Sequence, residues 1–136
     1  MARRIGVVVA VGLWSLSFAC LADTAGRPES PQVRVVALPE DVRPFFPILA
    51  GPPDTVSMES GLVTVEPGRS VGLHSTGRYE ELLVPLEGEG EVRMPGMHAV
   101  PIKRGWIVYS PPGTEHDVVN TGRTPLRYVF IVARVP

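Results

Sequence analysis

The most informative stretch of the chain is Gly105–Asn120, which reads GWIVYSPPGTEHDVVN. Two short, mostly apolar runs flank Pro111, Pro112 and Gly113, residue types that end strands and form turns. The stretch therefore predicts a strand, a tight turn and a second strand that carries His116. Its glycine, proline, histidine and asparagine positions follow the spacing G-x5-P-x-G-x2-H-x3-N.

A second set of spaced residues lies upstream of this stretch. Gly68, His74, Glu81 and Gly88 follow the spacing G-x5-H-x-T-x4-E-x6-G, in which the threonine is Thr76. Together the two patterns resemble the two motifs of the cupin family. The downstream motif is complete, and the upstream motif departs from the family at one position.

The cupin resemblance covers residues 62–132 and implies an all-β, double-stranded β-helix, or jelly roll, with a pocket inside the barrel. In metal-binding cupins, two histidines and a glutamate of the first motif and one histidine of the second hold the ion. Carried over residue by residue, these ligands are His74, Glu81 and His116. Thr76 replaces the remaining histidine, and a threonine hydroxyl is a poor permanent ligand. We therefore expect Thr76 to hydrogen-bond a metal-bound water instead.

The residue types at these positions agree with the resemblance. Two neutral imidazole nitrogens and one carboxylate suit a divalent first-row metal, and Fe, Mn, Zn, Ni and Cu all remain open. The spacing to the following glycine favours Glu81 over its neighbour Glu80 as the acidic ligand. The alternative is a pocket that binds a small ligand without a metal. Three further side chains are expected at or near the pocket: Arg78, Trp106 and Tyr109.

Short apolar runs separated by Gly- and Pro-containing turns make up the rest of the chain, and no window has helical spacing over three turns. A hairpin is predicted around Pro95-Gly96, and a turn at Glu59-Ser60-Gly61. Val33–Leu38 is predicted to be a short strand. Pro39–Pro53 holds five prolines, so irregular structure is expected there.

The predicted organisation has three parts: a signal peptide at residues 1–22, a linker and Pro-rich arm with one short strand at 23–54, and a cupin barrel at 55–136. Ile5–Leu21 follows two arginines and contains no charged residue, which is typical of a secretory signal. A periplasmic or secreted protein is therefore expected. A membrane anchor, or a lipoprotein acylated at Cys20, is the alternative.

Charge and motif content limit the classes of partner that the chain is expected to bind. The formal net charge is -1 and no basic run occurs, which argues against nucleic acid as a partner. No nucleophile triad, phosphate loop or organic-cofactor fingerprint is present, so no catalytic residue is identified. The resemblance implies a small-molecule ligand and a homodimer, and leaves dioxygenase and isomerase chemistry equally open. The alternatives are a metal-free module for a sugar-like or aromatic molecule, and an interaction protein that uses a Phe45-Phe46 loop.

Overall fold

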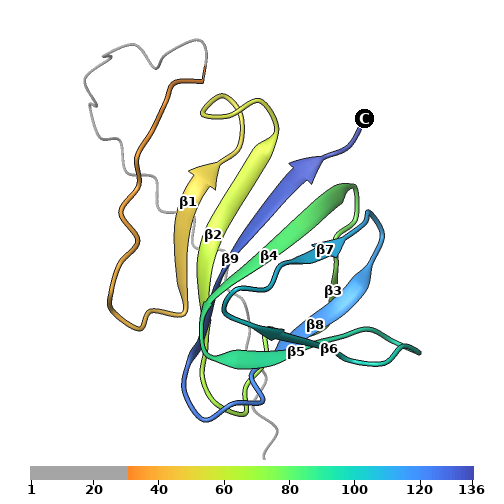
Figure 1. The fold of residues 1–136 in the computed structure, drawn as a ribbon. Coiled ribbons are helices and arrows are strands. Elements are labelled where there is room, and N and C mark those ends of the chain that lie inside the picture. The colour runs from red at the N-terminus through yellow and green to blue at the C-terminus, as the bar shows by residue number, and fades with distance from the viewer. Residues whose placement is uncertain (1–30) are drawn as a thin grey trace, which may run out of the picture.

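The computed structural model describes residues 31–136, which form β-strands and no helix (Figure 1). In chain order the strands are β1 (Phe45–Ala50), β2 (Met58–Val65), β3 (His74–Ser75), β4 (Tyr79–Glu87), β5 (Glu89–Arg93), β6 (Val100–Lys103), β7 (Val108–Ser110), β8 (Glu115–Val119) and β9 (Leu126–Arg134). Every pairing between them is antiparallel. The all-β class predicted from the sequence is confirmed.

The strands form two sheets. One has five strands in the order β1-β2-β9-β4-β7, and the other has four in the order β3-β8-β5-β6. From β2 onward the chain changes sheet after every strand except β5, which pairs with β6 as a hairpin. This repeated crossing between two sheets is the connectivity of a jelly roll.

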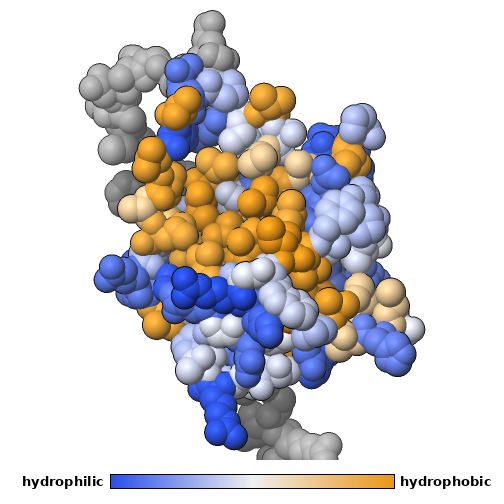
Figure 2. Space-filling view, in the orientation of Figure 1, coloured by the Kyte–Doolittle hydropathy of each residue, from blue (hydrophilic) through white to orange (hydrophobic). Residues whose placement is uncertain are grey.

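The core lies between the two sheets. Along β4, buried and half-buried residues alternate, which is the two-residue period of a strand with one face on the core. The central cluster takes side chains from both sheets: Val65, Leu83, Leu126 and Tyr128 from the larger and Val92, Ile102 and Val118 from the smaller. Complete burial of a side chain such as Leu83 stabilises the fold by about 1.5–3 kcal/mol. Apolar side chains also gather at the surface over β1, β2, β9 and β4 (Figure 2).

The hairpin predicted around Pro95-Gly96 is confirmed, and two residues of the motifs, Gly88 and Asn120, shape the connections between strands. The β5–β6 hairpin turns at Pro95-Gly96, and Gly96 has a φ of 71°. Gly88, between β4 and β5, has a φ of 74°, and a Cβ there would lie under 3.0 Å from the Pro125 carbonyl oxygen. Asn120 donates to the carbonyl oxygens of Val65 and Thr124, each at 2.8 Å. This buried amide therefore ties the end of β2 to the turn that precedes β9.

The N-terminal strand lies elsewhere than predicted. Val33–Leu38 forms no strand, and Val33 and Val35 are almost fully exposed. Without a neighbouring strand these residues have no ladder of hydrogen bonds to join. Phe45–Ala50, inside the Pro-rich segment, instead forms β1 and pairs with β2. Pro47 is tolerated there because β1 is an edge strand with a register shift after Pro47.

Two further predictions change with this strand. Glu59-Ser60-Gly61 is not a turn but the middle of β2, paired with both β1 and β9. Phe45 and Phe46 belong to β1 and are not a loop, so any interaction surface that they form would be part of the sheet.

The predicted signal peptide at residues 1–22, with Cys20, lies outside the described residues. Within residues 31–136 no helix is long and apolar enough to cross a membrane.

Candidate metal centre

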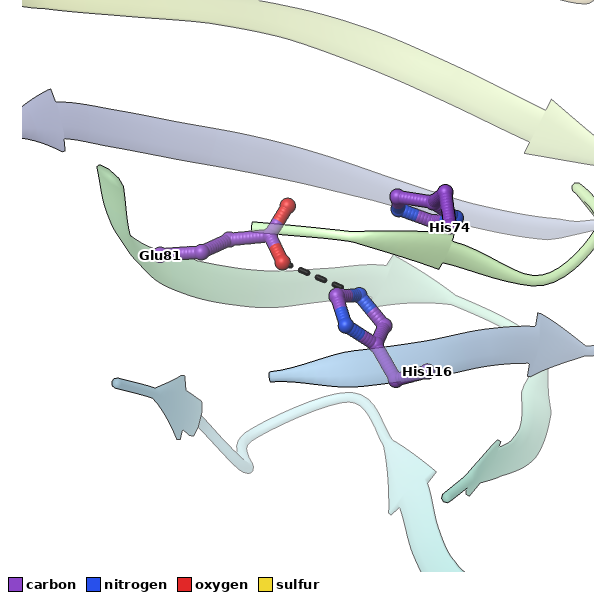
Figure 3. Close-up of side chains that lie close together, drawn as sticks. All are labelled: His74, Glu81 and His116. Carbon is purple, nitrogen blue, oxygen red and sulfur yellow. Dashed lines mark ion pairs between the residues drawn. The ribbon is translucent and has the colours of Figure 1, made fainter. Parts of the chain in front are cut away.

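Three side chains from the two cupin-like motifs meet between the sheets (Figure 3). His74 in β3 and His116 in β8 are direct cross-strand partners, and their ring centroids are 4.5 Å apart. Glu81 reaches toward them from β4, in the opposite sheet. One donor atom of each residue lies within 4.8 Å of the others, so the group could hold a metal ion.

Backbone carbonyls set the orientation of both imidazole rings. The Nδ1 atom of His74 lies 2.8 Å from the Gly72 carbonyl oxygen, and that of His116 lies 3.4 Å from the Thr114 carbonyl oxygen. A carbonyl oxygen can only accept, so Nδ1 carries the proton in each neutral ring and Nε2 keeps its lone pair. Metal-binding histidines are commonly held in this way, with the second ring nitrogen donating to a carbonyl.

The contact between Glu81 and His116 lacks a hydrogen bond. Nε2 of His116 and Oε2 of Glu81 are 3.0 Å apart, yet both buried atoms lack a hydrogen-bond partner. In the neutral ring both atoms present lone pairs, so this approach is repulsive unless a cation lies between them. The Glu81 carboxylate accordingly raises the pKa of His116, while burial acts in the opposite direction. A proton or a metal ion would satisfy both atoms, so the donor set fits a cation.

Thr76 lies beside this group, but its hydroxyl is engaged elsewhere. Oγ1 donates to the Pro111 carbonyl oxygen at 2.9 Å and accepts from the Thr114 amide at 2.9 Å. The side chain is buried and fastens the end of β3 to the turn before β8. Through these two hydrogen bonds to the backbone, Thr76 holds β3 and the turn before β8 together at the edge of the site.

A cavity of about 450 Å³ opens next to the three side chains. Its aromatic wall consists of Phe45, Tyr79, Tyr128 and Phe130, and aliphatic side chains complete the apolar surface. Its polar groups are His74, Ser75, Thr76, His116 and two carboxylates, Glu59 and Glu81. None of the described residues that line it is a lysine or an arginine. His74 is exposed while His116 is fully buried, so the group is open to solvent on the His74 side.

The other three residues that the sequence placed near the pocket do not line this cavity. Arg78 lines a separate surface depression with Arg134. Trp106 is half-exposed and packs under the ammonium group of Lys103. Tyr109 points away from the centre and donates to Glu80 at 3.2 Å.

Two residues that face the cavity were missed by the sequence analysis. Glu59 was assigned to a turn, although alternation along a continuous β2 would have placed it on the inner face. Tyr128 lies in no motif of the sequence analysis; it is buried, and it also lines the cavity. Burial, and then the charge of Glu81, raises the pKa of Tyr128, so its hydroxyl stays protonated.

Comparisons with known proteins agree with the fold. The family described as "Cupin domain" matches residues 61–132. A curated oxalate-binding protein of Thermotoga maritima is 38% identical over 66 residues. That match covers 48% of this chain and 54% of the relative, so it spans only about half of the relative's length.

Solved structures extend the likeness to the whole barrel. A Cupin 2 conserved barrel domain protein from Salinispora arenicola superposes with a TM-score of 0.63 over 76% of this chain and 92% of that one, at 22% identity. A predicted oxalate decarboxylase from Thermotoga maritima matches with a TM-score of 0.53 at 25% identity, over 70% of this chain and 99% of that one. These matches establish the double-stranded β-helix fold expected from the two motifs.

Proposed function

Because this chain belongs to the cupin domain family, and its two motifs converge on one cation-compatible group, we propose that it binds a divalent first-row metal ion. His74 and His116 would bind the ion through Nε2, and Glu81 through its carboxylate. The ion would face a small molecule in the adjoining cavity. The observation that carries the proposal is the unsatisfied pair of His116 Nε2 and Glu81 Oε2, 3.0 Å apart in a buried site.

Three protein ligands leave coordination positions open, which distinguishes such a site from a closed structural one. A divalent ion bound there would supply Lewis-acid activation of oxygen donors in a ligand. The chain's own residues would fix the orientation of both imidazoles and exclude water along the aromatic wall. Tyr128 could donate a hydrogen bond from inside the cavity. This arrangement supports binding of a small oxygen-donor molecule and, on that basis, an enzymatic or a sensing role.

The names of two similar proteins make oxalate the first ligand to test. A carboxylate could bind the metal directly, which supports the choice. The cavity supports it less well, because its other walls combine apolar side chains with the carboxylate of Glu59, and none of the described lining residues is a lysine or an arginine that could bind a second carboxylate. Oxalate binding would therefore depend on the metal alone, and a thermal shift by oxalate should vanish after the metal is removed with EDTA.

Metal analysis tests the proposal itself. Protein purified without chelator should contain close to one equivalent of a divalent metal, and His116→Ala should lower the affinity at least about 100-fold. His98→Ala is the matched control, because His98 is exposed and outside the cavity. Negligible metal in the wild type, in His98→Ala and in His116→Ala alike, even after incubation with Mn²⁺, Fe²⁺, Ni²⁺, Cu²⁺ and Zn²⁺, would refute metal binding.

A further inference from the structure

Glu59 is a second carboxylate in the cavity, on the same wall as Glu81. In the register of the large sheet, Glu59 in β2 lies opposite Val132 in β9, and Val132 lies opposite Glu81 in β4. Residues directly opposite each other in antiparallel strands point to the same face. The row Glu59–Val132–Glu81 therefore spans the inner face, with its two acidic residues two strand spacings apart, about 10 Å between Cα atoms.

The backbone makes room for the Glu59 side chain. Gly51 is buried beside the Glu59 side chain. A Cβ at residue 51 would lie 3.0 Å from Cγ and 3.2 Å from Oε1 of Glu59, so the glycine leaves the space that this side chain fills. The carboxylate is thus held at the β1 side of the cavity. Within residues 31–136 it takes part in no hydrogen bond or ion pair, although it is only partly exposed. Its oxygens are therefore available to accept charge-assisted hydrogen bonds from a cationic group of a ligand.

The surface between the two carboxylates is apolar. Val132 separates them in the row, and Phe130 lies in the next row, opposite Gly61 and Leu83. Phe45 lies opposite Val63, one row further on, and its ring stacks with that of Phe130 at a centroid distance of 6.3 Å. Aromatic faces near a carboxylate favour organic cations further. The wall therefore offers, in order, a metal-binding end, an apolar middle and an anionic end.

From this arrangement we infer that Glu59 determines ligand specificity, and that the cavity takes a small molecule with metal-binding oxygens at one end, an apolar middle and a protonated amine at the other. The inference rests on the proposed metal site and goes beyond it by naming the ligand class. It also predicts discrimination against a ligand with a carboxylate at the far end, because that group would face Glu59.

Three aromatic hydroxamates with one metal-binding head and different far ends test the inference. They are 4-(aminomethyl)benzohydroxamate, 4-methylbenzohydroxamate and 4-carboxybenzohydroxamate, which end in a cation, a neutral methyl group and an anion. Calorimetric titration of the Zn²⁺-loaded protein should show the aminomethyl compound binding about tenfold more tightly than the methyl compound, with the carboxy compound weakest.

Glu59→Gln should abolish this order while leaving Zn²⁺ content unchanged, and it should change the affinity for the methyl compound much less than that for the aminomethyl compound. Glu59→Asp keeps the charge and should retain a reduced preference for the amine. Glu66→Gln is the control, since Glu66 is an exposed carboxylate just past the end of β2 and does not line the cavity. An unchanged preference in Glu59→Gln, or no binding of any of the three compounds by Zn²⁺-loaded protein, would overturn the inference.

Zn²⁺ content measured on the same samples shows whether the role of Glu59 or the proposed metal site is at fault. Wild-type protein that takes up no metal contradicts the metal site itself. Protein that holds Zn²⁺ and binds the methyl compound, but ignores charge at the far end, contradicts only the role of Glu59.

Discussion

Thr76 is where this chain departs from the family pattern, and its contacts explain what the residue does instead. Its hydroxyl makes two hydrogen bonds to the backbone around the turn before β8. The sequence showed that Thr76 stands where the family has a histidine ligand. It did not predict the two hydrogen bonds of Thr76, because their partners Pro111 and Thr114 are 35 and 38 residues away in the chain. The expectation that Thr76 would contact a metal-bound water stays a prediction.

Replacing Thr76 with valine keeps the side-chain shape and removes both bonds. We expect the free energy of unfolding of the metal-free protein to fall by about 2–4 kcal/mol, because the Thr114 amide also loses its partner. Metal affinity should fall far less than in His116→Ala. Urea unfolding and metal titration measure the two effects, with exposed Thr121→Val as the control. A loss of metal equal to that of His116→Ala would make Thr76 a ligand.

The pKa of His116 leads to a prediction about pH. Metal binding requires a deprotonated Nε2, and Glu81 raises the pKa of this imidazole in the metal-free protein. Protons should therefore begin to displace the metal at a higher pH than at an ordinary histidine, whose pKa is about 6.5. Below the raised pKa, the apparent affinity should fall by about tenfold per pH unit.

The same pKa shift has the opposite sign for the stability of the metal-free fold. A folded-state pKa above the unfolded one contributes stability that is fully present below the unfolded value and lost as pH rises through the folded value. NMR titration of His116 in metal-free protein, with Glu81→Gln as the comparison, measures the shift. A His116 pKa at or below the ordinary value, or one unchanged in Glu81→Gln, would contradict this account.

At the scale of elements, strands bounded by Pro-Gly turns were predictable and the β1–β2 pair was not. The Pro95-Gly96 hairpin is local, so neighbouring residues specify it. β1 forms because its backbone can pair with the edge of β2. β2 continues through Gly61, where the sequence suggests a turn. Gly61 has a packing role: a Cβ there would lie 2.6 Å from Phe45 and 2.8 Å from Phe130.

Gly61→Ala should therefore disturb the aromatic wall. We expect a loss of about 1–3 kcal/mol of stability, because one or both rings must move. Phe45→Ala in the same chain removes one of the two clashes, so the double variant should lose less than the sum of the single losses. Thermal or urea unfolding of the four proteins of this cycle measures the coupling. Strictly additive losses would show that Phe45 does not limit the space at Gly61.

At the scale of the whole molecule, the sequence predicted the three candidate metal ligands but not the other residues that line the cavity. His74, Glu81 and His116 occupy motif positions, so a family resemblance names them without knowledge of strand register. Glu59 lines the same cavity only because β2, β9 and β4 pair in one particular register. Register depends on long-range pairing, and a shift of one residue would turn Glu59 to the outer face.

The outer face of the large sheet is the surface where we expect the predicted homodimer to form. Leu82 and Val84 in β4 lie opposite Ile131 and Val129 in β9, and all four point away from the cavity and are only half-buried. A sheet that is apolar on both faces usually has both faces covered, and here a second copy of the chain is the expected cover.

We therefore expect Ile131→Glu to convert a dimer into a monomer, because a charge would be buried where two apolar faces meet. Light scattering coupled to size exclusion measures the mass, and Val56→Glu, which adds the same charge at a highly exposed loop position, should leave it unchanged. Metal content should stay at the wild-type level in both variants, since Ile131 lies on the face opposite Glu81. A monomeric wild-type protein, or a dimer that survives Ile131→Glu, would contradict this interface. The second outcome would place the contact on another surface, and the apolar outer face would then have to be covered by something other than a second copy.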